Sequence, residues 1–391
     1  MRSSSCWLIS FFIAASPAAA EECVFDKVTF TSDFEGGRIS GCRKTGPDAF
    51  EIGVAPEDAP INPSAWYAFA VEAKEDTDIE VTLAYSNGRH RYAPKVSVAK
   101  SEWTELPDIA VSEDGSRASF PLHIAEGRTL VAAQSLIGAD DYVAWLQKAL
   151  LIAPDMTEVT IGRSEERRAI EGLRSRKRGR EAVVLIGRQH PPETTGAVAF
   201  FVFAERMLAD DPLAKRFRKR FGLLIIPMLN PDGVAHGQWR HNSRGVDINR
   251  DWGPFTQVET RAARDAIANF AGEKPGRLAL FLDFHSTWRD VLYTQPDEAV
   301  GSRAWFACAW RSQIEKQLGS APERSDSHNP ALPTSKSWAH ETYAVPAITF
   351  ELGDTTPTEN IHALARTAAE TAMILLLEGP PQDMEAQQEP S

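Results

Sequence analysis

The sequence is poor in cysteine and in positive charge, and it lacks a long hydrophobic run near its amino terminus. Only 4 of its 391 residues are cysteines, and their spacing does not match a zinc–thiolate site. The formal net charge of −12 argues against binding to a phosphate backbone, which needs clustered Lys and Arg. The first apolar stretch is shorter than the ~20 residues of a membrane-spanning helix. We therefore expect no nucleic-acid partner and no membrane anchor.

The amino terminus has the three parts of a secretory signal peptide. Arg2 supplies a positive charge, Trp7 to Ala15 form a short apolar stretch, and Ala18 to Ala20 provide the small residues of a cleavage site. We expect residues 1–20 to be a signal peptide that is removed after Ala20. The mature protein is then periplasmic or secreted.

An exported protein folds in an oxidising compartment, which gives the remaining cysteines a meaning. Cys23 and Cys42 are close in sequence at the start of the mature chain. They could pair, and the closed loop would contribute about 3 kcal/mol in the chain-entropy model. Cys308 lies in an apolar helical pattern, which predicts a buried thiol.

Length and composition allow two domains, since 391 residues with 43% hydrophobic content can bury a large core. From Val24 to Ile152 short alternating runs are separated by turn dipeptides such as Asn87-Gly88 and Asp114-Gly115, a pattern typical of strands. We expect residues 21–153 to form a small antiparallel β-sandwich. A linker near Ala153 follows.

From Thr157 onward the pattern changes to alternating strands and helices. This alternation predicts an α/β/α sandwich with a mostly parallel mixed sheet over residues 157–378. The tail, residues 379–391, is rich in Pro, Gln and Glu and is expected to be disordered. The expected strands are 182–189, 221–227, 277–284 and 346–352, and the expected helices are 194–209, 257–270, 302–318 and 358–377.

Polar residues stand repeatedly where a predicted strand ends. His190 and Glu193 follow the apolar run that ends at Ile186, and His285 and Glu351 end two further strands. Open α/β folds bind their ligands at this carboxyl edge of the sheet. Each short pattern alone is weak, so the repetition carries the argument.

Two histidines and one carboxylate can hold zinc tetrahedrally, with the fourth position open to water. His190, Glu193 and His285 are such a set. The metal lowers the pKa of the water to about 7 and polarises a substrate carbonyl. Glu351 could take the proton of the water and pass it to a leaving amine. The guanidinium groups of Arg240 and Arg250 could face an oxyanion and a substrate carboxylate.

On these motifs the chain resembles the zinc carboxypeptidases of the carboxypeptidase A superfamily, in particular the cytosolic carboxypeptidase branch and its bacterial relatives. The resemblance covers roughly residues 157–378. The β-rich front also looks like the amino-terminal domain of that branch. The matching residues are His190, Glu193, Asn230-Pro231-Asp232-Gly233, Arg240, Gly245, Asp247-Ile248-Asn249-Arg250, Trp252, His285 and Phe350-Glu351.

The resemblance implies a zinc carboxypeptidase-like fold, one zinc ion per chain and a peptide substrate. The implied metal ligands are His190, Glu193 and His285. The other implied roles are general base for Glu351, oxyanion stabilisation for Arg240, and binding of the terminal carboxylate for Asn249 and Arg250.

The resemblance also suggests where specificity lies. The residue fifteen positions before the catalytic glutamate lines the floor of the side-chain pocket in this family, and here it is Lys336. A buried lysine would favour a C-terminal Glu or Asp, although an exposed lysine is an equally good interpretation. One departure concerns pocket closure, because Asn329 stands where the pancreatic branch has a mobile tyrosine.

The prediction is an exported zinc metallocarboxypeptidase that favours an acidic C-terminal residue. One alternative is a murein stem-peptide amidase or carboxypeptidase, because export brings cell-wall peptides within reach. Another is an inactive peptide- or glycan-binding protein that uses the β-domain. The complete set of metal ligands and base argues against an inactive protein.

Overall fold

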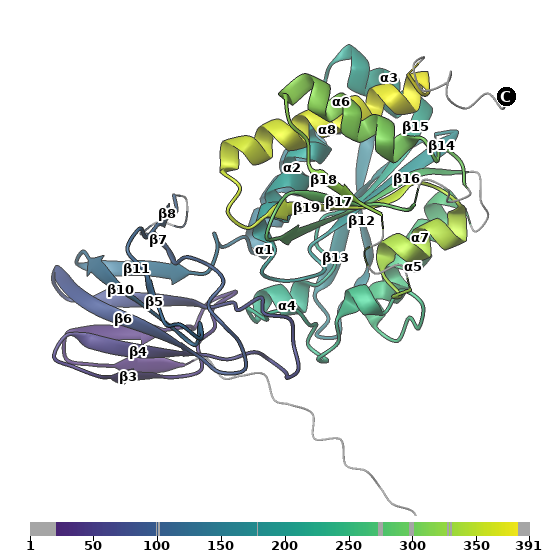
Figure 1. Cartoon of the computed structure of the whole chain (residues 1–391). Coiled ribbons are helices and arrows are strands. Elements are labelled where there is room, and N and C mark those ends of the chain that lie inside the picture. The colour runs from purple at the N-terminus through teal and green to yellow at the C-terminus, as the bar shows by residue number, and fades with distance from the viewer. Residues whose placement is uncertain are drawn as a thin grey trace, which may run out of the picture.

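The computed structural model describes residues 21–98, 100, 102–177, 179–272, 277–296, 301–326, 328 and 331–381. The predicted signal peptide, Asn329 and residues 382–391 of the predicted disordered tail lie outside these residues. Two bodies follow one another along the chain, a β-rich amino-terminal part and a larger α/β part (Figure 1). Within the described ranges, no helix has both the length and the hydrophobicity needed to cross a membrane.

The amino-terminal part is a sandwich of two sheets, as the alternating sequence predicts. Their inner faces share one hydrophobic core that contains Phe30 and Phe69 from one sheet and Phe50 and Phe120 from the other. The first sheet has the order β1 (Glu22–Val24), β2 (Val28–Thr31), β5 (Ala68–Ala73), β11 (Gly127–Ala132), β7 (Lys95–Ser97) and β8 (Thr104–Glu105). The second has the order β3 (Cys42–Lys44), β4 (Ala49–Val54), β6 (Thr77–Tyr85), β10 (Arg117–Ile124) and β9 (Ala110–Val111).

Two features refine the predicted sandwich. The pairing of β4 with β6 is parallel, so the second sheet is not wholly antiparallel. Cys23 and Cys42 form a disulfide, with their Cα atoms 6.1 Å apart. Because Cys23 lies in β1 and Cys42 in β3, the bond joins an edge strand of one sheet to an edge strand of the other.

The α/β part contains a mixed sheet of eight strands. Its four central strands, β15, β14, β16 and β19, are mutually parallel, and the flanking pairs include antiparallel ones. Strand β16 is buried along almost its whole length, because helices cover both faces of the sheet. The order is β12 (Met156–Arg163), β13 (Ala169–Ser175), β15 (Phe221–Ile226), β14 (Glu181–Gly187), β16 (Leu278–Thr287), β19 (Ala347–Gly353), β17 (Val291–Tyr293) and β18 (Glu323–Ser325).

Helices form a layer on each side of this sheet (Figure 1). One layer is α1 (Ala139–Ile152), α2 (Thr194–Leu208), α3 (Pro212–Arg220), α6 (Phe306–Leu318) and α8 (Thr358–Glu378). The other is built from α5 (Val258–Ala271) and α7 (Ser335–Tyr343). The short helices α4 (Pro231–Ala235) and η1 (Ile248–Arg250) lie in the connections near the carboxyl edge of the sheet. The predicted α/β/α sandwich is confirmed.

Two sequence-based expectations are wrong. Residues 139–152 form helix α1 rather than part of a β region, because Tyr142, Trp145, Leu146 and Ala149 lie at helical spacing on one buried face. Its buried residues belong to the core of the α/β part. Cys308 is only half-buried, and its Sγ accepts a hydrogen bond from Arg324 Nη1 at 3.0 Å.

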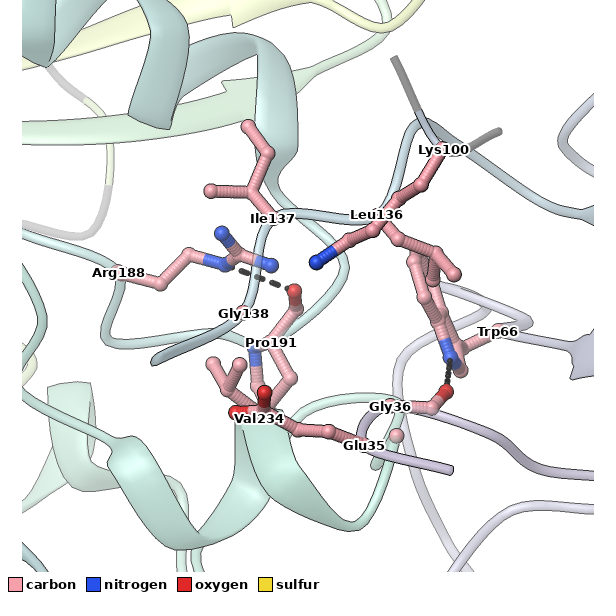
Figure 2. Close-up of a pocket in the computed structure, with 11 residues that line it drawn as sticks. Glu35, Gly36, Trp66, Lys100, Leu136, Ile137, Gly138, Arg188, Pro191 and Val234 are labelled. Atoms are coloured by element: carbon pink, nitrogen blue, oxygen red, sulfur yellow. Dashed lines mark hydrogen bonds between the residues drawn. The ribbon is translucent and has the colours of Figure 1, made fainter. Parts of the chain in front are cut away.

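The two parts meet along a close interface. A cavity of about 10 Å³ lies between them, lined by Trp66 and Gly36 from the sandwich and by Arg188 and Pro191 from the α/β part (Figure 2). In this view Trp66 Nε1 donates to the Gly36 carbonyl at 2.8 Å. The Gly36 amide in turn donates to the carbonyl of Ala235 at 2.9 Å. Backbone atoms of the two parts are therefore in direct contact.

Candidate metal centre and active site

The loop between β14 and α2 carries His190 and Glu193 to the carboxyl edge of the sheet. Arg188 begins this loop in the left-handed region, with φ of 51°, a conformation that is uncommon for a residue with a side chain. Its buried guanidinium holds the loop from inside: Nε donates to the Pro191 carbonyl at 2.9 Å and Nη1 to Tyr142 Oη at 3.1 Å. The loop is thus fixed before helix α2 begins.

His285 reaches the same place from β16, the strand next to β14. Gly196, in the first turn of α2, lies so close to β16 that an added Cβ would be 2.4 Å from the His285 carbonyl oxygen. Ser286 Oγ receives hydrogen bonds from the Gly196 amide and from Thr195 Oγ1, both at 2.8 Å. This close approach of helix and strand brings His285 to the loop that carries His190 and Glu193.

The three predicted metal ligands are buried together. His190, Glu193 and His285 each offer a ligand atom, and these atoms lie within 4.8 Å of one another. Glu193 lies between the two rings: Oε1 is 2.9 Å from His190 Nδ1 and Oε2 is 2.7 Å from His285 Nδ1. Burial would raise the pKa of Glu193, but the two imidazoles hold it well below its ordinary value. Two imidazole nitrogens and one carboxylate suit a zinc ion.

The second nitrogen of each ring contacts another carboxylate. His190 Nε2 is 3.0 Å from Asp247 Oδ1, and His285 Nε2 is 2.8 Å from Asp283 Oδ2. Burial would lower the pKa of His285, but Asp283 and Glu193 raise it well above its ordinary value. Carboxylates in this position fix the ring orientation and the tautomer of metal-binding histidines. The surroundings of the cluster therefore fit a metal site.

Further contacts hold these two carboxylates in place. Asp283 Oδ2 also accepts a hydrogen bond from Gln189 Nε2 at 2.6 Å and one from Ser335 Oγ. Asp247 Oδ1 accepts from the Asn249 amide at 2.9 Å. Burial would raise the pKa of Asp247, but His190 and Arg240 keep it below its ordinary value.

Glu351 lies beside this cluster. It pairs with His285 in the parallel register of β16 and β19. Its Oε2 atom is buried and makes no hydrogen bond within the described part of the chain. Burial, together with the negative charges of Glu193 and Asp283, raises the pKa of Glu351 to about 8. A carboxyl group in these surroundings is suited to accept and release a proton near neutral pH.

The predicted polar residues of the substrate site lie near the cluster. Arg240 is buried, and its Nε donates to Asp247 Oδ2 at 2.7 Å. Asn249 Nδ2 is 3.4 Å from His285 Nε2, while its Oδ1 accepts from the Ser335 amide at 2.9 Å. Arg250 is half-buried, and burial lowers its pKa despite the negative charge of Asp247. Asn249 thus contacts a ligand directly, Arg240 is joined to His190 through Asp247, and Arg250 lies next to Asn249.

Lys336 is buried at the start of α7, and this excludes the interpretation of an exposed lysine. Its Nζ donates to the carbonyls of Thr294 at 3.1 Å and His328 at 3.3 Å. Burial lowers its pKa to about 8. Burial lowers the pKa of His328, and the charges of Lys336 and Arg250 lower it further, so the two cations border the same region.

Sequence reasoning did not assign the contacts that hold the ligands. Asp247 belongs to the matched motif, but the motif does not show that its carboxylate contacts His190. Asp283 stands two positions before His285 in the same strand, and its contact with that ring is seen only in the structure. Gln189 and Ser335 were not singled out. The sequence gives one indication of the role of Gln189, which is its position directly before the predicted ligand His190.

Comparison with known proteins gives two family matches. A sequence profile described as zinc carboxypeptidase matches residues 142–373. A second profile, described as the cytosolic carboxypeptidase N-terminal domain, matches residues 30–132. Together they cover both parts of the structure.

Individual relatives agree with the profiles. Mouse cytosolic carboxypeptidase 4 is 40% identical over 129 residues, which are 32% of this chain and 11% of that protein. Rat cytosolic carboxypeptidase-like protein 5 is 44% identical over 75 residues, or 19% of this chain and 9% of that protein. The matched segments thus span about a tenth of these relatives. A crystal structure of a metallo-carboxypeptidase from Burkholderia cenocepacia has the same fold, with a TM-score of 0.76, 19% identity, and coverage of 89% of this chain and 98% of that one.

Proposed function

The chain belongs to the zinc carboxypeptidase family, and from this premise we propose that it is an exported enzyme that removes an acidic residue from the carboxyl terminus of peptides. The observation that carries the enzymatic part is the buried cluster of His190, Glu193 and His285 with Glu351 beside it. The observation that carries the acidic preference is the buried ammonium group of Lys336.

His190, Glu193 and His285 would hold one zinc ion, with Asp247 and Asp283 fixing the two rings. When bound, zinc supplies Lewis-acid catalysis, which polarises a carbonyl group and makes water a better nucleophile. Proton transfer is the task of Glu351. Its buried Oε2, which makes no hydrogen bond to the described residues, would accept the proton of the attacking water and deliver it to the leaving amine.

The guanidinium groups would take the two negative charges of the reaction. Arg240 is held by Asp247 through Nε, so its remaining N–H donors can face the oxyanion that forms at the scissile carbonyl. Asn249 and Arg250 would bind the terminal carboxylate of the substrate, for which a guanidinium fork is well shaped. This arrangement requires a free carboxyl terminus and therefore favours a carboxypeptidase over an endopeptidase.

Lys336 would select the side chain that is removed. A buried ammonium group costs free energy unless a carboxylate neutralises it. Burial already lowers the pKa of Lys336 to about 8, and a bound Glu or Asp side chain would offset this cost. An aliphatic side chain would add no negative charge beside the ammonium group.

We also propose that the enzyme is periplasmic or secreted. The sequence pattern of residues 1–20 supports this location. So does the disulfide between Cys23 and Cys42, because such bonds persist in oxidising compartments.

The test is a panel of peptides that differ only in the last residue, assayed with zinc content measured on the same sample. We expect one zinc per chain and a higher kcat/KM for Glu- and Asp-ended peptides than for Leu- or Lys-ended ones. A purified cell-wall stem peptide belongs in the panel, and its preferential cleavage would favour the murein alternative. Zinc-loaded protein that binds peptides and cuts none would contradict the proposal.

A further inference from the structure

Arg240 belongs to the α/β part, but the backbone that carries it is held by the amino-terminal sandwich. The sandwich contributes the loop that follows β4, with Glu57 and Asp58. Glu57 Oε2 accepts a hydrogen bond from the Trp239 amide at 2.7 Å. Its Oε1 accepts from the amides of Arg240 at 2.9 Å and His241 at 2.8 Å. One carboxylate therefore binds three consecutive N–H groups, and the middle one is that of Arg240.

The geometry favours a fixed contact over a chance one. The Glu57 side chain is only 6% exposed, and a buried carboxylate is stable when its oxygens are saturated with donors. Trp239, the residue before Arg240, is fully buried in the hydrophobic core of the sandwich. An added Cβ at Gly88 would lie 2.6 Å from the Trp239 ring, so the ring has little room to move.

The α/β part holds the same segment from the other side. Asn230 Nδ2 donates to the His241 carbonyl at 3.0 Å. The Arg240 side chain then reaches Asp247, which contacts His190. A continuous series of contacts runs from Glu57 through the backbone of Arg240 to the metal ligands.

We propose that Glu57 is a positioning residue for catalysis, through which the amino-terminal sandwich sets the location of the Arg240 guanidinium. The inference rests on the proposed function, because it takes Arg240 to stabilise the oxyanion. Oxyanion donors act only when they lie within hydrogen-bond distance of the developing charge. A shift of the Arg240 backbone would therefore lower turnover more than it weakens substrate binding.

The experiment is a double-mutant cycle of Glu57→Gln and Arg240→Ala, with zinc content and melting temperature measured for every variant. Glutamine keeps the shape of the Glu57 side chain. Its NH2 group replaces one carboxylate oxygen, so a donor faces the backbone N–H groups where they need an acceptor. We expect Glu57→Gln to lower kcat by about tenfold or more, with KM changed less than about twofold. In the Arg240→Ala background the same change should have little further effect, because the group that it positions is gone. Equal losses in both backgrounds would overturn the proposal.

Asp58→Asn is the matched control. Asp58 lies in the same loop and its Oδ2 is 3.1 Å from His241 Nδ1, but it makes none of the three amide contacts. We expect its kcat to stay within about twofold of the wild-type value. A loss equal to that of Glu57→Gln would show a general effect of domain contact and would overturn the assignment to Glu57.

Hydrogen exchange of the amides of residues 239–241 provides a reading that does not depend on activity. We expect faster exchange in Glu57→Gln than in Asp58→Asn, and equal rates would overturn the proposed contact. A zinc-loaded wild-type protein that cuts no peptide would overturn the proposed function. An active wild-type protein with an additive cycle would overturn only the role of Glu57.

Discussion

At the residue scale, the site combines groups whose ionisation is shifted in opposite directions by their surroundings. Glu193 and Asp247 have pKa values below the ordinary range because imidazoles and guanidinium groups offset the effect of burial. The pKa of Glu351 is raised to about 8, because burial is the largest influence on it. Such separation of neighbouring carboxyl groups is typical of catalytic sites, where one group binds and another transfers protons.

Lys336→Met should remove the preference for acidic residues. The substitution keeps the length of the side chain and removes the charge that would pair with a substrate Glu. A hydrogen bond to a charged group contributes roughly 1.5–3 kcal/mol, so kcat/KM for a Glu-ended peptide should fall by about 10- to 100-fold. The same peptide ending in Leu is the control and should be cut at least as well as before. Equal losses for both peptides would remove Lys336 from the specificity site.

The preference should also depend on pH. Burial lowers the pKa of Lys336 to about 8, so the ammonium form dominates below pH 8 and is lost above it. The ratio of kcat/KM for Glu-ended over Leu-ended peptides should therefore fall as the pH rises from 7 to 9. The ratio cancels the titration of groups that act on both substrates, such as Glu351. A ratio that stays constant across this range would show that the selecting group is not Lys336.

At the scale of secondary-structure elements, the site depends on how closely α2 approaches β16. Gly196→Ala would place a Cβ 2.4 Å from the His285 carbonyl oxygen, so helix and strand must separate. His190 and Glu193 precede the helix and His285 lies on the strand, so the separation should widen the metal site. We expect about a 10- to 100-fold loss of zinc affinity, similar to the loss of a contact that supports a metal ligand.

Competition with a zinc chelator measures this loss. Gly46→Ala is a suitable control, because an added Cβ there would meet only the Ala49 Cβ at 3.2 Å, far along the chain from the site. The control should bind zinc as the wild type does. Unchanged zinc affinity in Gly196→Ala would mean that α2 can shift without moving the ligands.

The elements that carry the ligands were predictable because their sequences are simple. Strands β14, β16 and β19 are apolar runs buried on both faces, and polar residues of the site lie within the last three positions of β16 and β19 or shortly after β14. The sequence does not predict helix α1, because over a short window its buried residues separated by polar ones resemble the alternation of a strand. In strand β12 only Met156 is buried, and the residues after it are half-buried or exposed, which is a weak signal for a strand at the edge of a sheet.

The contacts that orient the site could not be predicted in the same way. The three ligands follow from motifs that are local in sequence, but Asp247 contacts His190 across 57 positions and Glu57 contacts Arg240 across 183. Neither contact corresponds to a recognisable spacing of residues in the sequence. Both arise only when two cores have formed and their loops meet.

At the scale of the whole molecule, an ion pair joins the sandwich to the α/β part. Arg91 Nη2 lies 2.8 Å from Asp354 Oδ2, and both side chains are at least 93% buried. Gln134 Nε2 also donates to the Asp354 carbonyl at 2.9 Å. Asp354 follows β19, the strand that carries Glu351, so this interface lies next to the active site.

Arg91→Met should lower the free energy of unfolding by an amount that depends on pH. Burial raises the pKa of Asp354 to about 6, although Arg91 acts to lower it. The ion pair therefore contributes above pH 6, where Asp354 is ionised, and its contribution is lost as the pH falls below 6. Without Arg91 the ionised carboxyl is left buried and unpaired, which costs about 3 kcal/mol or more.

Urea unfolding of Arg91→Met and the wild type at pH 8 and pH 5 measures this difference. The loss of unfolding free energy should be large at pH 8 and clearly smaller at pH 5, because a protonated Asp354 no longer needs a cation. Lys148→Met is the control, since it removes an exposed partner of Glu205 and should cost less than about 1 kcal/mol at either pH. If the loss in Arg91→Met is the same at both pH values, its cause is lost packing against Tyr92 and Trp288 rather than the charge of Asp354. Such a result would show that the charge interaction does not stabilise the contact between the two parts.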